Sequence, residues 1–255
     1  MIDQQMHSRF GHHPEQLFRD NLELVEQRIA AACARAGRSR SSVTLLPVTK
    51  TVPSAMLRHA AHAGITVMAE NKIQEGHQKS LDLGDLGIKW TVVGHLQTNK
   101  VEKMIEFASE FQALDSLRLA QLINAELVSV GRSLDVYVQV NTSDEESKYG
   151  IGPDQVIDFV KELSRFPALK PRGLMTLAIL NGNPEDVRSC FRRLRAVRDA
   201  LTAAHPYCGI EKLSMGMTSD FEIAIEEGAD IVRIGQAIFG KRPTKDGHFW
   251  PGLLP

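Results

Sequence analysis

The stretch KLSMGMTSDFEIAIEEGADIVRIGQAIFG, residues 212–240, decides the fold. It contains two short β-rich runs, KLSMGM at 212–217 and ADIVRIG at 229–235, with a segment of helical character between them. Ser219 is followed three residues later by Glu222, a capping-box pattern that predicts a helix start between the two runs. Strand, helix and strand in this order are typical of a parallel sheet with crossover helices.

The same alternation runs through most of the chain. Six further β-rich runs come before this stretch: VTLLPVT (43–49), ITVMAE (65–70), IKWTVVG (88–94), EFQALD (110–115), LDVYVQVN (134–141) and PRGLMTL (171–177). Between them, Pro53, Pro153 and Pro184 stand where first helical turns would begin. Asn183 is the expected N-cap residue of the helix that starts at Pro184.

About eight strand and helix pairs, with no Pro/Gly/Ser-rich linker between them, predict an α/β protein with a single (β/α)8 TIM barrel. A doubly wound open sheet is the alternative, because periodicity cannot distinguish a closed sheet from an open one. Pro47 counts mildly against the first strand, since proline lacks the N–H group that a sheet ladder uses.

An extra helix is expected before the barrel. Apolar residues recur at helical spacing there, and Gly37 supplies a stop: Leu17, Leu24, Val25, Ile29 and Cys33. We expect residues 1–13 to be a disordered polar lead, residues 14–242 to form the barrel domain, and residues 243–255 to form a tail.

Composition and charge point away from several classes of protein. The formal net charge of -1, with 43% hydrophobic and 24% charged residues, gives no electrostatic reason to expect nucleic acid or a membrane surface as a partner. The arginines of CFRRLRAVRDAL (190–201) are expected on the solvated back of an amphipathic helix. Three scattered cysteines and no signal-peptide pattern favour a reducing, cytoplasmic location. The histidines lack the spacing of a metal site.

The residues at the expected strand ends carry the chemistry, because the functional face of a parallel barrel is where its strands end. These positions hold Lys50, Asn71, Ser214, Arg233 and Gly235. A lysine among apolar residues loses hydration of its ammonium group, which favours the free amine that attacks aldehydes. Glycine-containing turns that lead into helices favour a bound phosphate. Together they predict pyridoxal 5′-phosphate (PLP) as the ligand.

Six blocks of the sequence carry a resemblance to a known family: PVTKTVP (47–53), AENKIQEG (69–76), GHLQTNK (94–100), SKYGI (147–151), GLMTLA (173–178) and the block at 213–240. They resemble the pyridoxal phosphate homeostasis proteins, the YggS/PROSC family, from about residue 15 to residue 242. The chain departs from the family's usual pattern at Pro47 and in its C-terminal tail. The resemblance implies an alanine-racemase-like barrel, a fold type III PLP protein, with a leading helix.

The resemblance also implies roles for single residues. Lys50 matches the lysine that holds PLP as a Schiff base, and Ser214 matches the hydroxyl that contacts the phosphate. Gly235 and Gln236 match the second phosphate-binding turn. By similarity to alanine racemases, Arg233 would lie beside the pyridine nitrogen.

Asn71 is expected as a wall residue of the same pocket. Arginine only donates hydrogen bonds, so a contact from Arg233 would keep the pyridine nitrogen unprotonated and weaken the ring as an electron sink.

The implied function is a carrier or buffer in intracellular vitamin B6 homeostasis, without established catalytic turnover. We expect a monomer, with PLP-dependent apo-enzymes as candidate recipients. A racemase-type enzyme of the same barrel is the alternative, and a Schiff-base aldolase is a distant third. The tyrosines that could supply a racemase's second acid or base, Tyr137, Tyr149 and Tyr207, lie outside the expected mouth-facing strand ends. Tyr149, in a loop, is the least easy of them to exclude.

Overall fold

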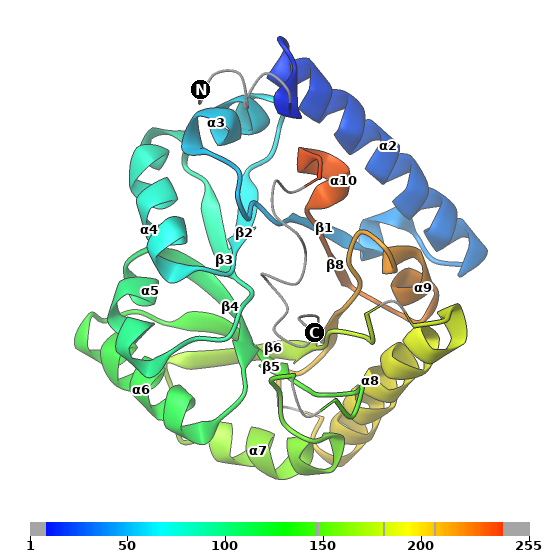
Figure 1. Ribbon diagram of the computed structural model, residues 1–255. Helices are drawn as coiled ribbons and strands as arrows, with labels where there is room; N and C mark the ends of the chain where they lie inside the picture. The colour runs from blue at the N-terminus through cyan, green and yellow to red at the C-terminus, as the bar shows by residue number, and fades with distance from the viewer. Residues whose placement is uncertain (1–8, 146–147, 181, 207, 242–255) are drawn as a thin grey trace.

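The computed structural model describes residues 9–145, 148–180, 182–206 and 208–241. Within these residues, eight parallel strands lie inside a ring of helices (Figure 1). The strands are β1 (Thr44–Pro47), β2 (Val67–Glu70), β3 (Lys89–Val92), β4 (Ala108–Leu114), β5 (Leu134–Gln139), β6 (Leu169–Met175), β7 (Lys212–Ser214) and β8 (Ile231–Ile234). Each β-rich run of the sequence overlaps one of these strands, although β4 and β6 begin two residues before their runs, so the predicted strand pattern is confirmed.

The sheet closes into a barrel. Its hydrogen-bonded order is β1-β8-β7-β6-β5-β4-β3-β2, which leaves β1 and β2 at the two ends of the order. These ends meet just beyond β1, where Val48 and Ala69 form a parallel bridge and the Thr49 N–H donates to the Ala69 carbonyl at 2.9 Å. The (β/α)8 barrel is therefore confirmed, and the doubly wound open sheet is wrong.

Pro47 is tolerated in β1 because of which neighbouring strand its backbone nitrogen faces. The N–H groups of Thr44 and Val48 donate toward β8, to the carbonyls of Asp230 and Ile234. Alternate residues of a strand bond to opposite neighbours, so the missing donor of Pro47 faces β2. Pairing with β2 begins only beyond Pro47, and the proline therefore removes no bond that the barrel uses.

Helices follow the strands around the outside. They are α2 (Pro14–Arg35), α3 (Ser54–His62), α4 (Ile73–Asp82), α5 (Val101–Phe107), α6 (Leu117–Ser129), α7 (Val156–Leu163), α8 (Pro184–Ala204), α9 (Phe221–Glu226) and α10 (Gln236–Phe239). Short 3₁₀ turns are η1 (Arg40–Ser42), η2 (Gly84–Leu86), η3 (Thr98–Lys100) and η4 (Pro153–Gln155). Among the described residues, no helix is both long and apolar enough to cross a membrane.

The predicted helix starts are mostly right. The Asn183 side chain caps α8 by accepting from the N–H groups of Glu185 and Asp186, both at 3.0 Å. The capping box at Ser219 is wrong. The turn after β7 places Asp220 at the N-cap of α9, and its carboxylate accepts instead from the Met217 N–H at 2.5 Å.

The leading helix α2 buries most of the predicted apolar stripe. Val25, Ile29 and Cys33 are buried, but Leu24 is 58% exposed. Of the expected lead of residues 1–13, the structure describes residues 9–13. Phe10 is buried and packs edge-on against Phe18, with ring centroids 5.8 Å apart.

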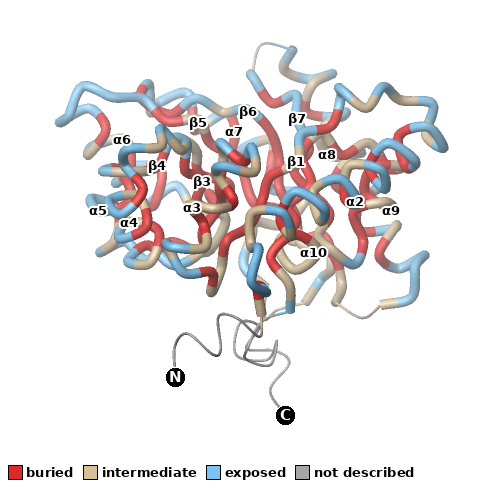
Figure 2. Tube along the Cα trace, turned by 90° about the horizontal axis from the view of Figure 1, so that it is seen from above, coloured by how far each residue is buried: buried red, intermediate tan, exposed pale blue. Residues whose placement is uncertain are grey.

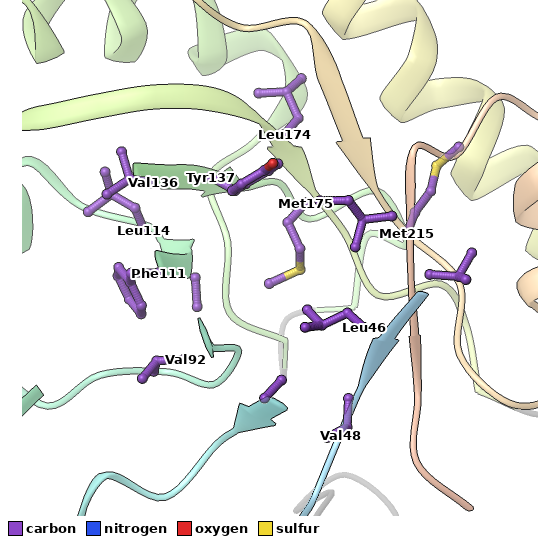
Figure 3. Packing of buried hydrophobic residues seen from close by; sticks show 14 of the residues in the cluster. Leu46, Val48, Val92, Phe111, Leu114, Val136, Tyr137, Leu174, Met175 and Met215 are labelled. Carbon is purple, nitrogen blue, oxygen red and sulfur yellow. The ribbon is translucent and has the colours of Figure 1, made fainter. Parts of the chain in front are cut away.

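The barrel interior is closely packed. The strands run through the buried centre of the molecule while the outer helix faces are exposed (Figure 2). Figure 3 shows side chains from different strands filling this space, including Leu46, Phe111 and Met175. Met175 and Met215 are fully buried in this core.

The arginines of residues 190–201 lie on α8, and each has a carboxylate partner. The pairs are Arg192 with Glu185, Arg193 with Asp144, Arg195 with Glu227 and Arg198 with Asp199. This agrees with their prediction as the solvated back of a barrel helix.

Candidate functional site

A pocket of about 520 Å³ opens at the carboxyl ends of the strands. Its walls come from the segments after β1, β2 and β3, from the end of β5 and from the segment after β6. The lining residues that matter below are Lys50, Asn71, Glu75, His95, Gln139 and Tyr149. The structure therefore brings two predicted site residues, Lys50 and Asn71, into one pocket.

A larger groove of about 630 Å³ lies elsewhere, between α7 and the end of α8. Its walls are mainly apolar and include Val160, Leu163 and Phe166. Functional sites of parallel barrels lie at the carboxyl ends of the strands, so we place the candidate site at the smaller pocket.

The backbone on both sides of Lys50 is held by polar contacts. The Thr49 hydroxyl donates to the Glu70 carboxylate at 2.7 Å, and the Thr51 N–H donates to the Glu75 carboxylate at 3.2 Å. Thr51 has a φ of 63°, in the left-handed region that residues other than glycine seldom adopt. The Arg9 guanidinium donates to the Thr51 carbonyl at 2.9 Å.

A buried ion cluster lies beneath this segment. The Lys79 ammonium donates to the Glu70 carboxylate at 2.5 Å, the Glu75 carboxylate at 2.8 Å and the Thr49 carbonyl at 2.9 Å. The side chains of Lys79 and Glu70 are only 5% and 1% exposed. Burial raises the pKa of the Glu70 carboxyl, although the Lys79 charge opposes that rise.

An aromatic pair stands at the mouth of the pocket. The rings of His95 and Tyr149 are stacked, with centroids 3.8 Å apart and planes 8° from parallel. His95 Nδ1 lies 3.2 Å from an Asp115 carboxylate oxygen, and the Gln139 side-chain amide donates to the Tyr149 carbonyl at 2.9 Å. Tyr149 is thus a pocket residue although it does not end a strand.

The other two tyrosines differ from Tyr149. Tyr137 is buried in the barrel, where burial raises the pKa of its hydroxyl above the ordinary value, so it is a core residue. Tyr207 lies outside the described residues.

Ser214 and Arg233 form a hydrogen-bonded chain inside the barrel. Arg233 donates to the Ser214 hydroxyl at 2.9 Å and to the Thr176 carbonyl at 2.7 Å, and the Ser214 hydroxyl donates to the Gln112 side-chain carbonyl at 2.6 Å. Burial lowers the pKa of Arg233 to about 10, against the opposing attraction of Asp220. The guanidinium therefore stays protonated near neutral pH.

Gly235 and Gln236 lie at the end of β8, next to the end of β1. Gly235 is the N-cap residue of α10, and Gln236 is the first residue of that helix. A Cβ atom at Gly235 would lie 2.8 Å from the Val48 carbonyl oxygen, so only glycine allows the two strand ends to approach this closely. Val48 precedes Lys50 by two residues, which places this turn beside the Lys50 segment.

Sequence reasoning from strand ends missed several pocket residues. Gln139, Lys148, Tyr149 and Leu177 line the pocket, yet Lys148 and Tyr149 lie in the loop after β5. The signal that could have found these two is the block SKYGI at 147–151, which was part of the family resemblance.

Comparison with known proteins identifies the family. The family model "Alanine racemase, N-terminal domain" matches residues 21–243. A pyridoxal phosphate homeostasis protein of Aquifex aeolicus is 40% identical over 88% of this chain and 97% of its own length. The protein of the same name from Escherichia coli K12 is 37% identical over 87% of this chain and 95% of its own length. The chain belongs to the pyridoxal phosphate homeostasis protein family.

Solved structures agree with this assignment. PipY of Synechococcus elongatus, in a structure with PLP bound, is 32% identical and has a TM-score of 0.75, covering 83% of this chain and all of that chain. An alanine racemase of Clostridium difficile has a TM-score of 0.63 at 18% identity, covering 89% of this chain and 58% of its own, which shows the shared fold alone. The resemblance drawn from the sequence blocks is therefore confirmed, as is the alanine-racemase-like barrel.

Proposed function

We propose that this member of the pyridoxal phosphate homeostasis family binds PLP as a Schiff base on Lys50 and acts as a reversible carrier or buffer of PLP in the cell. The observation that carries the proposal is that Lys50, at the end of the first barrel strand, lines the pocket at the mouth of the barrel. The PLP-bound structure of PipY supports the choice of ligand.

The chemistry of the pocket fits this ligand. The Lys50 amine would attack the aldehyde carbon of PLP, and the imine would form with release of one water, a step that water reverses. Three more lysines line the pocket, Lys72, Lys100 and Lys148, so its charge suits an anionic ligand. Asn71 would contribute to the wall beside Lys50.

The phosphate would be held at the ends of β7 and β8, where Gly235 permits close approach of backbone N–H groups and Gln236 begins α10. Ser214 would contact the phosphate only by exchanging its present bonds, because its hydroxyl already donates to Gln112 and accepts from Arg233. The bonds of Arg233 to Ser214 and to the Thr176 carbonyl use two of its five N–H donors, so a contact with the pyridine nitrogen would need one of the other three.

Such contacts are strong enough to retain PLP without the covalent bond. Hydrogen bonds to charged groups contribute about 1.5 to 3 kcal/mol each, and about 1.4 kcal/mol changes an affinity tenfold. Three phosphate contacts would therefore keep PLP in place while the imine opens and closes. This behaviour suits a carrier, which has to hold its ligand and also release it.

The experiment is to add PLP to the purified protein and record the visible imine absorbance, then to reduce the adduct with borohydride and locate it by mass analysis. We expect the adduct on Lys50, and its loss in Lys50→Ala. Lys100→Ala is the matched control, because Lys100 lines the same pocket. Equal imine absorbance in Lys50→Ala and wild type would refute the assignment.

A racemase-type enzyme is the second candidate, and the position of Tyr149 favours it. Racemisation needs a second proton-transfer group besides the lysine, and the pocket contains this tyrosine. The test is loss of optical activity from single amino acids with the PLP-loaded protein. Robust turnover that disappears in Tyr149→Phe would establish the enzyme and overturn the carrier proposal.

The remaining parts of the proposal concern the setting. The protein would act in the cytoplasm as a monomer, with PLP-dependent apo-enzymes as recipients and with neither nucleic acid nor membrane as a partner. Transfer is tested by mixing the loaded protein with a PLP-dependent apo-enzyme and following the recovery of that enzyme's activity. Recovery no faster than with an equal concentration of free PLP would argue against direct transfer.

A further inference from the structure

The two residues that flank Lys50 are held by the same buried ion cluster. The Lys79 ammonium binds the Thr49 carbonyl, and the Glu75 carboxylate binds the Thr51 N–H. Lys79 joins the two sides, because it also donates to the Glu75 carboxylate, and Glu70 accepts from both Lys79 and the Thr49 hydroxyl. This cluster therefore holds the peptide units on both sides of Lys50 in place.

The cluster is built to be rigid. An ammonium group has three N–H donors, and the three acceptors of Lys79 match them in number. Its side chain is 5% exposed, so no large rearrangement is open to it without leaving a buried charge unpaired. The cluster thus presents the Thr49 carbonyl and the Glu75 carboxylate at fixed positions.

The conformation of Thr51 shows that this segment needs such support. A non-glycine residue with a φ of 63° is strained, and such conformations persist only where the surroundings determine them. Glu75 holds the Thr51 N–H and Arg9 holds its carbonyl. The strained residue directly follows Lys50, so its conformation sets how the chain leaves the lysine.

We propose that Lys79, Glu70 and Glu75 are positioning residues that fix the direction in which the Lys50 side chain enters the pocket. This inference rests on the proposed function, since its consequence is the rate at which Lys50 condenses with the PLP aldehyde. Displacing a reacting group by about 1 Å costs on the order of 100-fold in rate.

The test uses the two substitutions Glu75→Ala and Glu75→Gln. Alanine removes the acceptor of the Thr51 N–H, whereas glutamine retains an oxygen that can accept it. We expect imine formation with saturating PLP to slow on the order of 10- to 100-fold in Glu75→Ala, and Glu75→Gln to restore most of the lost rate. The rates are measured by stopped-flow absorbance on protein whose folding is verified by circular dichroism.

Two controls separate positioning from other roles. Glu227→Ala removes a carboxylate that is 7% exposed, and so more deeply buried than Glu75 at 31%, from the ion cluster with Arg188 and Arg195 that precedes β8. Its rate should equal that of wild type. Pyridoxine 5′-phosphate, which has an alcohol in place of the aldehyde, binds without an imine, and its affinity should be no weaker in Glu75→Ala than in wild type, because losing a pocket carboxylate does not disfavour an anion.

The outcomes are distinct. An unchanged rate in Glu75→Ala, an equal loss in Glu75→Gln or in Glu227→Ala, or a matching loss of pyridoxine 5′-phosphate affinity would each overturn the inference while the proposed function stands. A wild-type protein that forms no adduct would overturn both. If Glu75→Ala does not fold, Thr49→Val tests the cluster from the other side, because it removes the hydroxyl bond to Glu70. A wild-type rate in Thr49→Val would then overturn the inference.

Discussion

Removing the Lys79 ammonium tests whether the ion cluster below the pocket is as tightly coupled as its geometry indicates. In Lys79→Met, the Glu70 carboxylate, 1% exposed in wild type, would keep the Thr49 hydroxyl at 2.7 Å and the Asn71 N–H at 3.3 Å as donors but would lose its cationic partner. Breaking a buried pair by deleting one partner costs about 3 to 5 kcal/mol of unfolding free energy. For a chain of this size, about 2 to 4 °C accompanies each kcal/mol, so we expect Tm to fall by about 6 to 20 °C.

The unfolding free energy is measured by urea titration with circular dichroism as the probe, for Lys79→Met and for two further variants. The double variant Lys79→Met with Glu70→Gln removes the unpaired charge as well and should recover at least half of the loss. Lys161→Met, at an exposed pair with Asp158 on α7, should change the unfolding free energy by no more than about 0.5 kcal/mol. A loss below about 1 kcal/mol in Lys79→Met, or a double variant no more stable than the single one, would refute this account of the cluster.

The stability that Lys79→Met loses relative to wild type should depend on pH in one direction. The pKa of Glu70 is already raised by burial in wild type, and loss of Lys79 removes the charge that opposes this rise. A carboxyl whose folded pKa lies above its unfolded value costs stability at high pH, and that cost disappears as pH falls through the folded pKa. The deficit of Lys79→Met should therefore shrink when unfolding is measured at decreasing pH below 7, and a deficit that grows would contradict the assignment.

Three other substitutions test separate parts of the structure. Gly235→Ala places a Cβ 2.8 Å from the Val48 carbonyl, so it should lower the unfolding free energy measured in urea by about 1 to 3 kcal/mol and weaken PLP retention. Unchanged values of both would show that the strand ends can separate freely. Glu110→Gln removes a carboxylate whose pKa is raised by burial, so it should stabilise the protein at pH 7, with a gain that shrinks toward acidic pH; a destabilised variant at pH 7 would be the contrary result. Asn183→Ala removes the N-cap of α8 and should lower the unfolding free energy by about 0.5 to 2 kcal/mol, whereas Asn183→Asp should retain it.

The order of strands and helices could be predicted because it depends on local patterns. Each β-rich run is a short apolar segment bounded by polar residues, and such segments are buried in a parallel sheet whatever lies beside them. Closure of the barrel was predicted from the number of strand and helix pairs and not from periodicity, because no periodicity encodes the bridge between Val48 and Ala69 that joins the two ends of the sheet. The error at Leu24 has a related cause, since a helical stripe does not show how wide the covered face is.

The candidate site was predicted in part for a similar reason. Lys50 and Asn71 closely follow the ends of β1 and β2, so the rule for parallel barrels places them at the mouth. Lys79 could not be found in this way, because in sequence it is one polar residue of the helix QEGHQKS that should face solvent. Only the packing of α4 against the ends of β1 and β2 turns its ammonium inward, between Glu70 and the Thr49 carbonyl.

The mouth of the pocket bears on the choice between carrier and enzyme. Water returns an imine to free amine and aldehyde, so closing a site against water protects an imine that has to react further. Here Tyr149 is 54% exposed, and its ring stacks on His95 at 3.8 Å, in a geometry that presents one ring face to the imidazole. An open mouth lets water and free amines reach Lys50, which favours exchange of PLP over repeated turnover on a bound amino acid. Tyr149→Ala removes this stack and should therefore speed the release of PLP to an added amine. Slower release would mean that the stacked rings of His95 and Tyr149 themselves promote the exchange.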